Sequence, residues 1–109
     1  MSWEINYLPD AAKDFRKLSK GQQIQVAKAI NKVAINPLPA QEGGYGKSLG
    51  NKQGNNLSGF LKIKLKNAGI RIVYKTVRTD SKMLIIVIGM RTDEQVYNEA
   101  QHRIEKYNL

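Results

Sequence analysis

The chain has 109 residues, 41% of them hydrophobic, which is enough for one modest core and predicts a single domain over residues 1–109. It contains no Cys, which excludes a disulfide-stapled secreted scaffold, thiolate zinc sites and cysteine nucleophiles. Eighteen Lys and Arg stand against nine Asp and Glu, so the formal net charge of +9 makes a polyanion the first candidate for a partner.

The ends and apolar runs of the sequence carry no targeting or membrane signal. The N-terminus lacks a basic region followed by an apolar core, and the longest apolar run, residues 83–88, is too short to span a bilayer. We therefore expect a cytoplasmic protein that does not contact membranes.

The positive charge is concentrated in residues 43–79, which hold none of the nine acids. A basic surface can simply favour solubility, but an acid-free window of this length favours a binding role. The eight cations of the window are Lys47, Lys52, Lys62, Lys64, Lys66, Arg71, Lys75 and Arg78.

The first third of the sequence predicts a strand followed by two helices. Alternating apolar residues indicate a strand over residues 3–8, which Pro9 ends, and Asp10 is the expected N-cap of a short helix. Apolar positions at helical spacing predict a second helix that ends before Pro37, so that the two helices form a hairpin.

The rest of the sequence predicts a loop, three strands and a final helix. Glycine-rich residues 37–59 are expected to form one flexible surface loop. Strands are predicted over residues 60–66, 70–78 and 83–90, and a capping box at Thr92 opens a helix with a single apolar stripe. The order β-α-α-β-β-β-α predicts an α+β fold: a mostly antiparallel four-stranded sheet with the helix hairpin on one face, a short C-terminal helix and one exposed face.

Candidate catalytic residues are few. One His and scattered acids do not predict a metal site, and no cofactor motif is present. What remains is a set of cations with a tyrosine: Lys62, Lys64, Arg71, Arg91 and Tyr97. Each has an ordinary structural explanation, but two lysines on one strand face and an arginine across the turn together describe a phosphate site.

Two segments, KIKLKNAGIRIVYK and VIGMRTDEQVYNEAQHRI, give the chain a close resemblance to the RelE toxins of bacterial toxin-antitoxin pairs. The resemblance implies a microbial-RNase-type fold that cleaves mRNA in the ribosomal A site, with the same five residues as its site. The gyrase-poisoning ParE relatives share the fold but not the complete set. A ParE-like gyrase inhibitor or a basic nucleic-acid-binding module is the alternative, and the branch with a Glu-His-Tyr site is disfavoured.

The expected reaction is metal-independent endoribonuclease cleavage by attack of the ribose 2′-OH, giving a 2′,3′-cyclic phosphate and a 5′-OH. Cation crowding would let a lysine act as base and would also stabilise a tyrosinate at Tyr97, and the sequence leaves these roles open. The absence of nearby acids is expected to let the site hold the phosphorane. Contacts to ribosomal RNA are expected from Lys47, Lys52, Lys66, Lys75 and Arg78.

The resemblance also implies several partners. They are a RelB-like antitoxin, the ribosome with its mRNA, and operator DNA reached through the antitoxin complex alone. The antitoxin would displace the C-terminal helix, whose single apolar stripe predicts weak docking.

Overall fold

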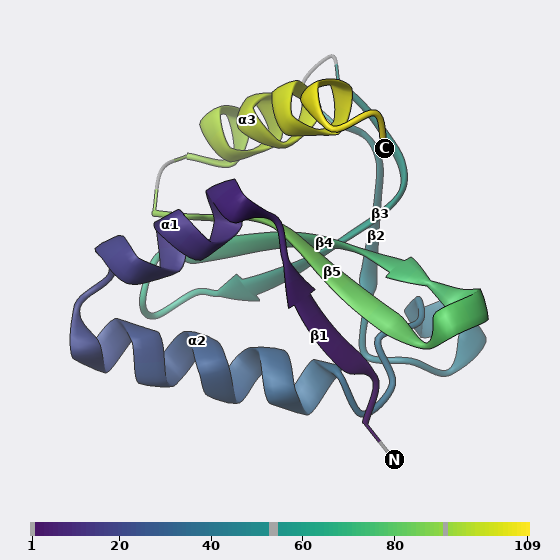
Figure 1. Ribbon diagram of the computed structural model, residues 1–109, viewed down its shortest axis with the longest axis horizontal. Helices are drawn as coiled ribbons and strands as arrows, with labels where there is room; N and C mark the ends of the chain where they lie inside the picture. The colour runs from purple at the N-terminus through teal and green to yellow at the C-terminus, as the bar shows by residue number, and fades with distance from the viewer. Residues whose placement is uncertain (1, 53–54, 91) are drawn as a thin grey trace.

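The computed structural model describes residues 2–52, 55–90 and 92–109, which form a five-stranded sheet with helices packed against it (Figure 1). The elements are β1 (Glu4–Tyr7), α1 (Pro9–Lys17), α2 (Lys20–Val33), the 3-10 helix η1 (Ala40–Glu42), β2 (Lys47–Lys52), β3 (Asn55–Leu65), β4 (Ile70–Val77), the 3-10 helix η2 (Arg78–Asp80), β5 (Lys82–Gly89) and α3 (Asp93–Lys106). The strand order is β1-β5-β4-β3-β2, and β1 pairs with β5 in parallel while the other pairs are antiparallel. The predicted α+β class is confirmed.

The helices begin where their local sequences favour it. The predicted capping box of α3 is present: Thr92 Oγ1 accepts from the Gln95 backbone N–H at 3.3 Å, and Gln95 Oε1 accepts in return from the Thr92 N–H. The expectation for α1 was wrong, because its N-cap is Leu8 and Asp10 lies in the first turn. Pro9 starts that helix, since its fixed φ suits the first helical position.

The segment predicted as one loop, residues 37–59, instead contains η1, β2 and the first part of β3, so the sheet has five strands and not four. The segment is fixed to the sheet at Tyr74, whose hydroxyl donates to the Pro37 carbonyl at 2.8 Å. Gly46 lies against this contact, where a Cβ would come within 2.5 Å of the Tyr74 hydroxyl. A side chain at Gly46 would therefore push the segment away from the sheet.

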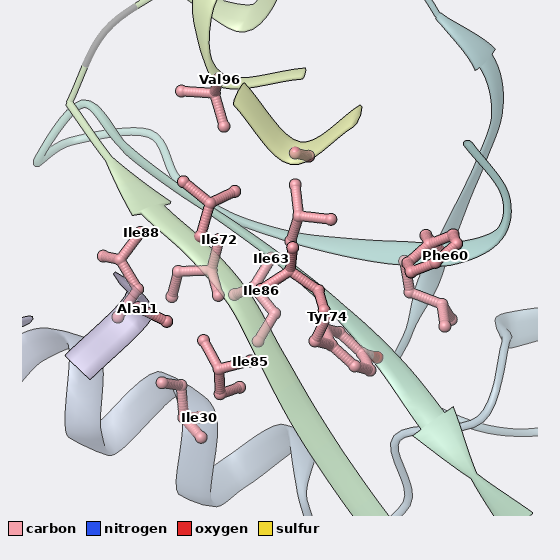
Figure 2. Packing of buried hydrophobic residues seen from close by; sticks show 14 of the residues in the cluster. Ala11, Ile30, Phe60, Ile63, Ile72, Tyr74, Ile85, Ile86, Ile88 and Val96 are labelled. Atoms are coloured by element: carbon pink, nitrogen blue, oxygen red, sulfur yellow. The ribbon is translucent and has the colours of Figure 1, made fainter. Parts of the chain in front are cut away.

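Both faces of the sheet are partly covered, which corrects the expectation of one exposed face. In Figure 1, α2 lies below the sheet and α3 lies above it, while α1 runs beside β1 and β5. Ile30 of α2 and Ile85 of β5 face each other in the core (Figure 2), and Val96 of α3 is fully buried. Gly89 lets α3 approach, since a Cβ there would lie 2.9 Å from Val96 Cγ2. None of the helices in the described part of the chain has the length and apolar composition of a membrane-spanning segment.

An ionic network holds α3 against α1 and the edge of β5. Beyond Ile85, β5 has no register partner in β1, and side chains satisfy its backbone: Arg103 Nη1 donates to the Ile86 carbonyl at 2.9 Å and Asp14 Oδ2 accepts from the Ile88 N–H at 3.1 Å. Arg103 Nη1 also donates to Asp14 Oδ2 at 2.6 Å. The C-terminal helix is thus held more firmly than its apolar stripe predicts.

Candidate phosphate-binding site

Strand register gathers cations on the sheet face that α3 partly covers. Lys62 and Lys64 alternate along β3 with buried Ile63, so both point to the face opposite the α2 core. Lys64 lies directly across from Arg71 of β4, and Lys62 lies across from Lys47 of β2. Residues that are opposite in an antiparallel pair share a face, so these four side chains form one cationic surface. We call Lys47, Lys62, Lys64 and Arg71 the cationic face.

The acid-free surroundings expected for these lysines are contradicted by Asp93, the first residue of α3. Lys64 Nζ donates to Asp93 Oδ2 at 3.0 Å, and Arg71 Nε donates to Asp93 Oδ1. The three side chains are 28%, 25% and 34% exposed for Lys64, Arg71 and Asp93 respectively. Asp93 lies 29 residues after Lys64 and 22 residues after Arg71 in the sequence, outside the acid-free window of residues 43–79.

The ionised form of Asp93 is the one that this site favours. Partial burial acts to raise the pKa of its carboxyl, but hydrogen bonds from Lys64 and Arg71, together with their charges, outweigh burial and lower that pKa from the ordinary value of 3.8. The carboxylate is therefore negatively charged at neutral pH and compensates part of the positive charge of the cationic face.

Tyr97 lies one helical turn after Asp93 and is 2% exposed. Burial raises the pKa of its phenol above 10.0, the nearby Asp93 charge raises it further, and Arg71 opposes this to a smaller extent. The expectation that the cations would stabilise a tyrosinate is therefore wrong, because burial and the carboxylate dominate. In this arrangement Tyr97 is a protonated phenol.

The remaining predicted residues are spread more widely. Lys66 lies in the turn after β3, outside the strand that had been predicted to include it, and is exposed. Lys75 lies on the same side of the sheet as the cationic face but further along β4. Its ammonium is 5.8 Å from the centre of the Phe60 ring. Arg78 in η2 forms a two-pronged ion pair with Glu42 at 2.7 Å.

Two further predictions fall where the structure gives no side-chain description. Arg91 lies outside the described residues, so its predicted place in the site stays a prediction. The backbone of Lys52 ends β2, but its side chain is likewise outside the described part of the chain. The structure thus brings together Lys62, Lys64, Arg71 and Tyr97 of the five predicted catalytic residues.

Two cavities adjoin the cationic face. One of about 260 Å³ is lined by residues 64–66 and 69–71 of the β3–β4 hairpin. The other, about 630 Å³, lies between α2 and the same hairpin, and Lys28 and Lys32 line it together with Lys64 and Lys66. Lys28 and Lys32 are more than 30 residues away from Lys64 and Lys66 in the sequence, so helical periodicity alone does not connect them with the site.

Asp93 is the residue of the candidate site that sequence reasoning missed, although a signal for it exists. It precedes Tyr97 by four residues, and residues at this spacing lie on the same side of a helix. A tyrosine placed in the site therefore predicts that Asp93 faces the site as well. Among the described residues, no group of three His, Cys, Asp or Glu side chains is placed to bind a metal ion.

Comparisons of sequence find bacterial toxins as relatives. The chain is 31% identical over 105 residues to an Escherichia coli protein described as a RelE-like toxin, which covers 95% of this chain and 99% of the relative. It is 28% identical over 107 residues to the mRNA interferase toxin RelE of Escherichia coli K12, with the same coverage. No protein-family model matches the sequence.

Comparisons of structure agree with those of sequence. A mutant of E. coli toxin RelE in the free state superposes with a TM-score of 0.71 at 27% identity, covering 95% of this chain and 99% of that one. A RelE mutant in complex with a peptide of the antitoxin RelB superposes with a TM-score of 0.69 at 25% identity, covering 92% and 95%.

Proposed function

Because this chain belongs to the RelE family of toxins, we propose that it is an endoribonuclease that cleaves mRNA in the ribosomal A site and so inhibits translation. A relative with 28% identity is named an mRNA interferase, which supports the reaction class. We propose both that cleavage takes place in the ribosomal A site and that it needs no metal ion bound by the toxin. We expect the protein to act in the cytoplasm, where ribosomes translate.

The observation that carries the proposal is the pairing of Lys64 and Arg71 with one carboxylate. The two cations come from adjacent strands, and each donates to a different oxygen of the same anion. A phosphodiester also presents two oxygens that share one negative charge, and Arg and Lys donors suit that geometry. Two cations that can hold one carboxylate can hold one phosphate in the same way.

The proposed reaction moves two protons and exchanges one phosphorus–oxygen bond for another. The ribose 2′-oxygen bonds to phosphorus as its proton passes to solvent water, and the bond from phosphorus to the 5′-oxygen breaks as that oxygen gains a proton from Tyr97, which solvent then restores. Lys64 and Arg71, with Lys62 beside them, stabilise the extra negative charge of the pentavalent intermediate. The products are a 2′,3′-cyclic phosphate and a 5′-OH.

Two residues of α3 and the preceding turn complete the proposed site. The raised pKa of Tyr97 keeps its phenol protonated, so we assign it as a donor to the leaving oxygen and not as the base. Contact with substrate requires α3 to shift, since Tyr97 is buried. Arg91 is proposed as a further phosphate ligand. With no tuned base among the described residues, substrate positioning on the ribosome supplies much of the rate.

We further propose a RelB-like antitoxin as the partner that silences the toxin. The support is a relative of similar structure in complex with a peptide of the antitoxin RelB. Operator DNA would be bound only through that complex. Given the Arg103–Asp14 network, an antitoxin that displaces α3 has to replace the ionic contacts of that helix as well as its apolar ones.

The test is to map RNA ends in a translating extract that contains the purified protein. We expect the message to be cut within codons, and only when ribosomes are present. The cuts should persist on purified ribosomes when no divalent metal is added beyond the Mg²⁺ that the ribosomes need. Arg71→Ala should lower the cleavage rate by about a hundredfold, since it removes a donor to the developing charge.

Arg16→Ala is the matched control, because it removes the same charge from an exposed position of α1 and should cleave like the parent chain. Equal cleavage by Arg71→Ala and Arg16→Ala would overturn the site. Intact message together with arrested DNA supercoiling would replace the nuclease with a gyrase inhibitor.

A further inference from the structure

Asp93 occupies the position between Lys64 and Arg71 that a substrate phosphate needs. Each of its carboxylate oxygens accepts a hydrogen bond from a different cation, from Lys64 Nζ at 3.0 Å and from Arg71 Nε. Its charge and its pair of oxygens match part of a phosphodiester. RNA and Asp93 therefore cannot both use these two donors in full.

The carboxylate can leave without strong penalty. Its side chain is 34% exposed, so water is already close to it. Asp93 lies in the first turn of α3, where the helix dipole stabilises the negative charge of the carboxylate even after it has lost its contacts with Lys64 and Arg71. The adjoining cavity of about 260 Å³, with Lys66 and Gly69 in its lining, gives an incoming anion an approach to Lys64 and Arg71.

We propose that Asp93 is a built-in competitor for the substrate phosphate: it holds Lys64 and Arg71 until an RNA strand displaces it, and so limits which RNA the site accepts. This inference rests on the proposed function in taking RNA as the ligand. Asp93 is tethered beside the cations, so its effective concentration there is high and a single weakly held phosphate displaces it poorly.

A strand held at several phosphates overcomes this competition. Lys62 and Lys47 lie on the same face as Lys64, so neighbouring phosphates of one strand can be bound while Asp93 is displaced. RNA that is also held by a ribosome gains the same advantage. The competitor thus selects for positioned RNA over loose RNA.

The opposite role is that Asp93 orients Lys64 and Arg71 for binding, and the two roles predict opposite signs. Removing the charge of a competitor strengthens RNA binding, whereas removing an orienting partner weakens it. Asp93→Asn keeps the size of the side chain and removes its charge. Glu94→Gln makes the same change of charge one residue later, at an exposed position in the same helical turn.

The experiment measures the dissociation constant of the full chain for a fluorescent single-stranded RNA whose 2′-positions are methylated, so that it cannot be cleaved. We expect Asp93→Asn to bind about threefold to tenfold more tightly than the parent chain, and Glu94→Gln to change binding by less than about twofold. Asp93→Ser is a second uncharged variant that should reproduce the gain.

Binding by Asp93→Asn that is equal to or weaker than that of the parent chain, or equal to that of Glu94→Gln, would overturn the inference. Because the methylated strand has no nucleophile, the result does not depend on cleavage. Tighter binding by Asp93→Asn with no cleavage by the parent chain supports the competitor and rejects the nuclease. Cleavage by the parent chain without that gain supports the nuclease and rejects the competitor.

Discussion

Asp93 links the stability of the fold to pH. The pKa of its carboxyl is lowered in the folded chain, since the hydrogen bonds from Lys64 and Arg71 outweigh partial burial. A depressed folded pKa contributes stability that is present above the ordinary value of 3.8 and is lost as the pH falls through the folded value. The contribution is small, because all three side chains are a quarter to a third exposed.

Asp93→Asn should therefore be slightly less stable than the parent chain at pH 7, by less than about 1 kcal/mol, and the difference should vanish in acid. Urea unfolding of both chains between about pH 7 and about pH 2 measures it. Glu94→Gln should show a smaller difference at pH 7. A gap between Asp93→Asn and the parent chain that grows as the pH falls would contradict the ion pairs.

Two ionic contacts of very different exposure fasten the helix α3. Arg103 and Asp14 are 8% and 15% exposed, whereas Lys106 and its partner Asp10 are 52% and 22% exposed. Removing one member of a buried pair leaves the other charge without compensation, which costs far more than breaking an exposed pair. The buried pair also satisfies the free backbone groups of β5, so its loss affects the strand as well as the helix.

Arg103→Met is expected to lower the free energy of unfolding by about 3 to 5 kcal/mol, because Asp14 stays buried without its partner. Lys106→Met is the matched control, with an expected loss of up to about 1 kcal/mol. Urea midpoints and slopes of the two variants provide the measurement. Similar losses in both would show that the network around Arg103 does not hold the helix.

Local signals predicted some elements fully and others not at all. The capping box at Thr92 and the apolar run of β5 determine structure through neighbouring residues, and both were predicted close to their observed bounds. β2 was missed because its single apolar residue, Leu49, lies among polar residues and one glycine and gives no alternation, and it becomes a strand by pairing with β3. The cationic face followed from strand alternation, whereas Asp93 reaches it through the packing of α3. The four-residue spacing to Tyr97 puts Asp93 on the same side of the helix, but it does not say against which strands that side packs.

The net charge of +9 is distributed unevenly over the molecule, and four of the cations cluster in the cationic face. Four phosphate contacts by the cationic face should make the affinity for single-stranded RNA fall with salt at a log–log slope of about −3, since each contributes about −0.7. Lys47→Ala should reduce the slope by about 0.7, and Lys13→Ala, an exposed position of α1, should leave it unchanged. Binding titrations across a salt series measure both, and equal slopes for the two variants would place the RNA elsewhere.

Contacts between the N-terminal and C-terminal segments of the chain determine when the protein can complete its folding during synthesis. β1 pairs with β5, and Asp14 contacts the Ile88 N–H and Arg103, which lie 74 and 89 residues further along. During synthesis the sheet cannot close and α3 cannot dock until nearly the whole chain has left the ribosome. A partner that binds the growing chain would therefore meet β1, α1 and α2 before the sheet has closed and α3 has docked.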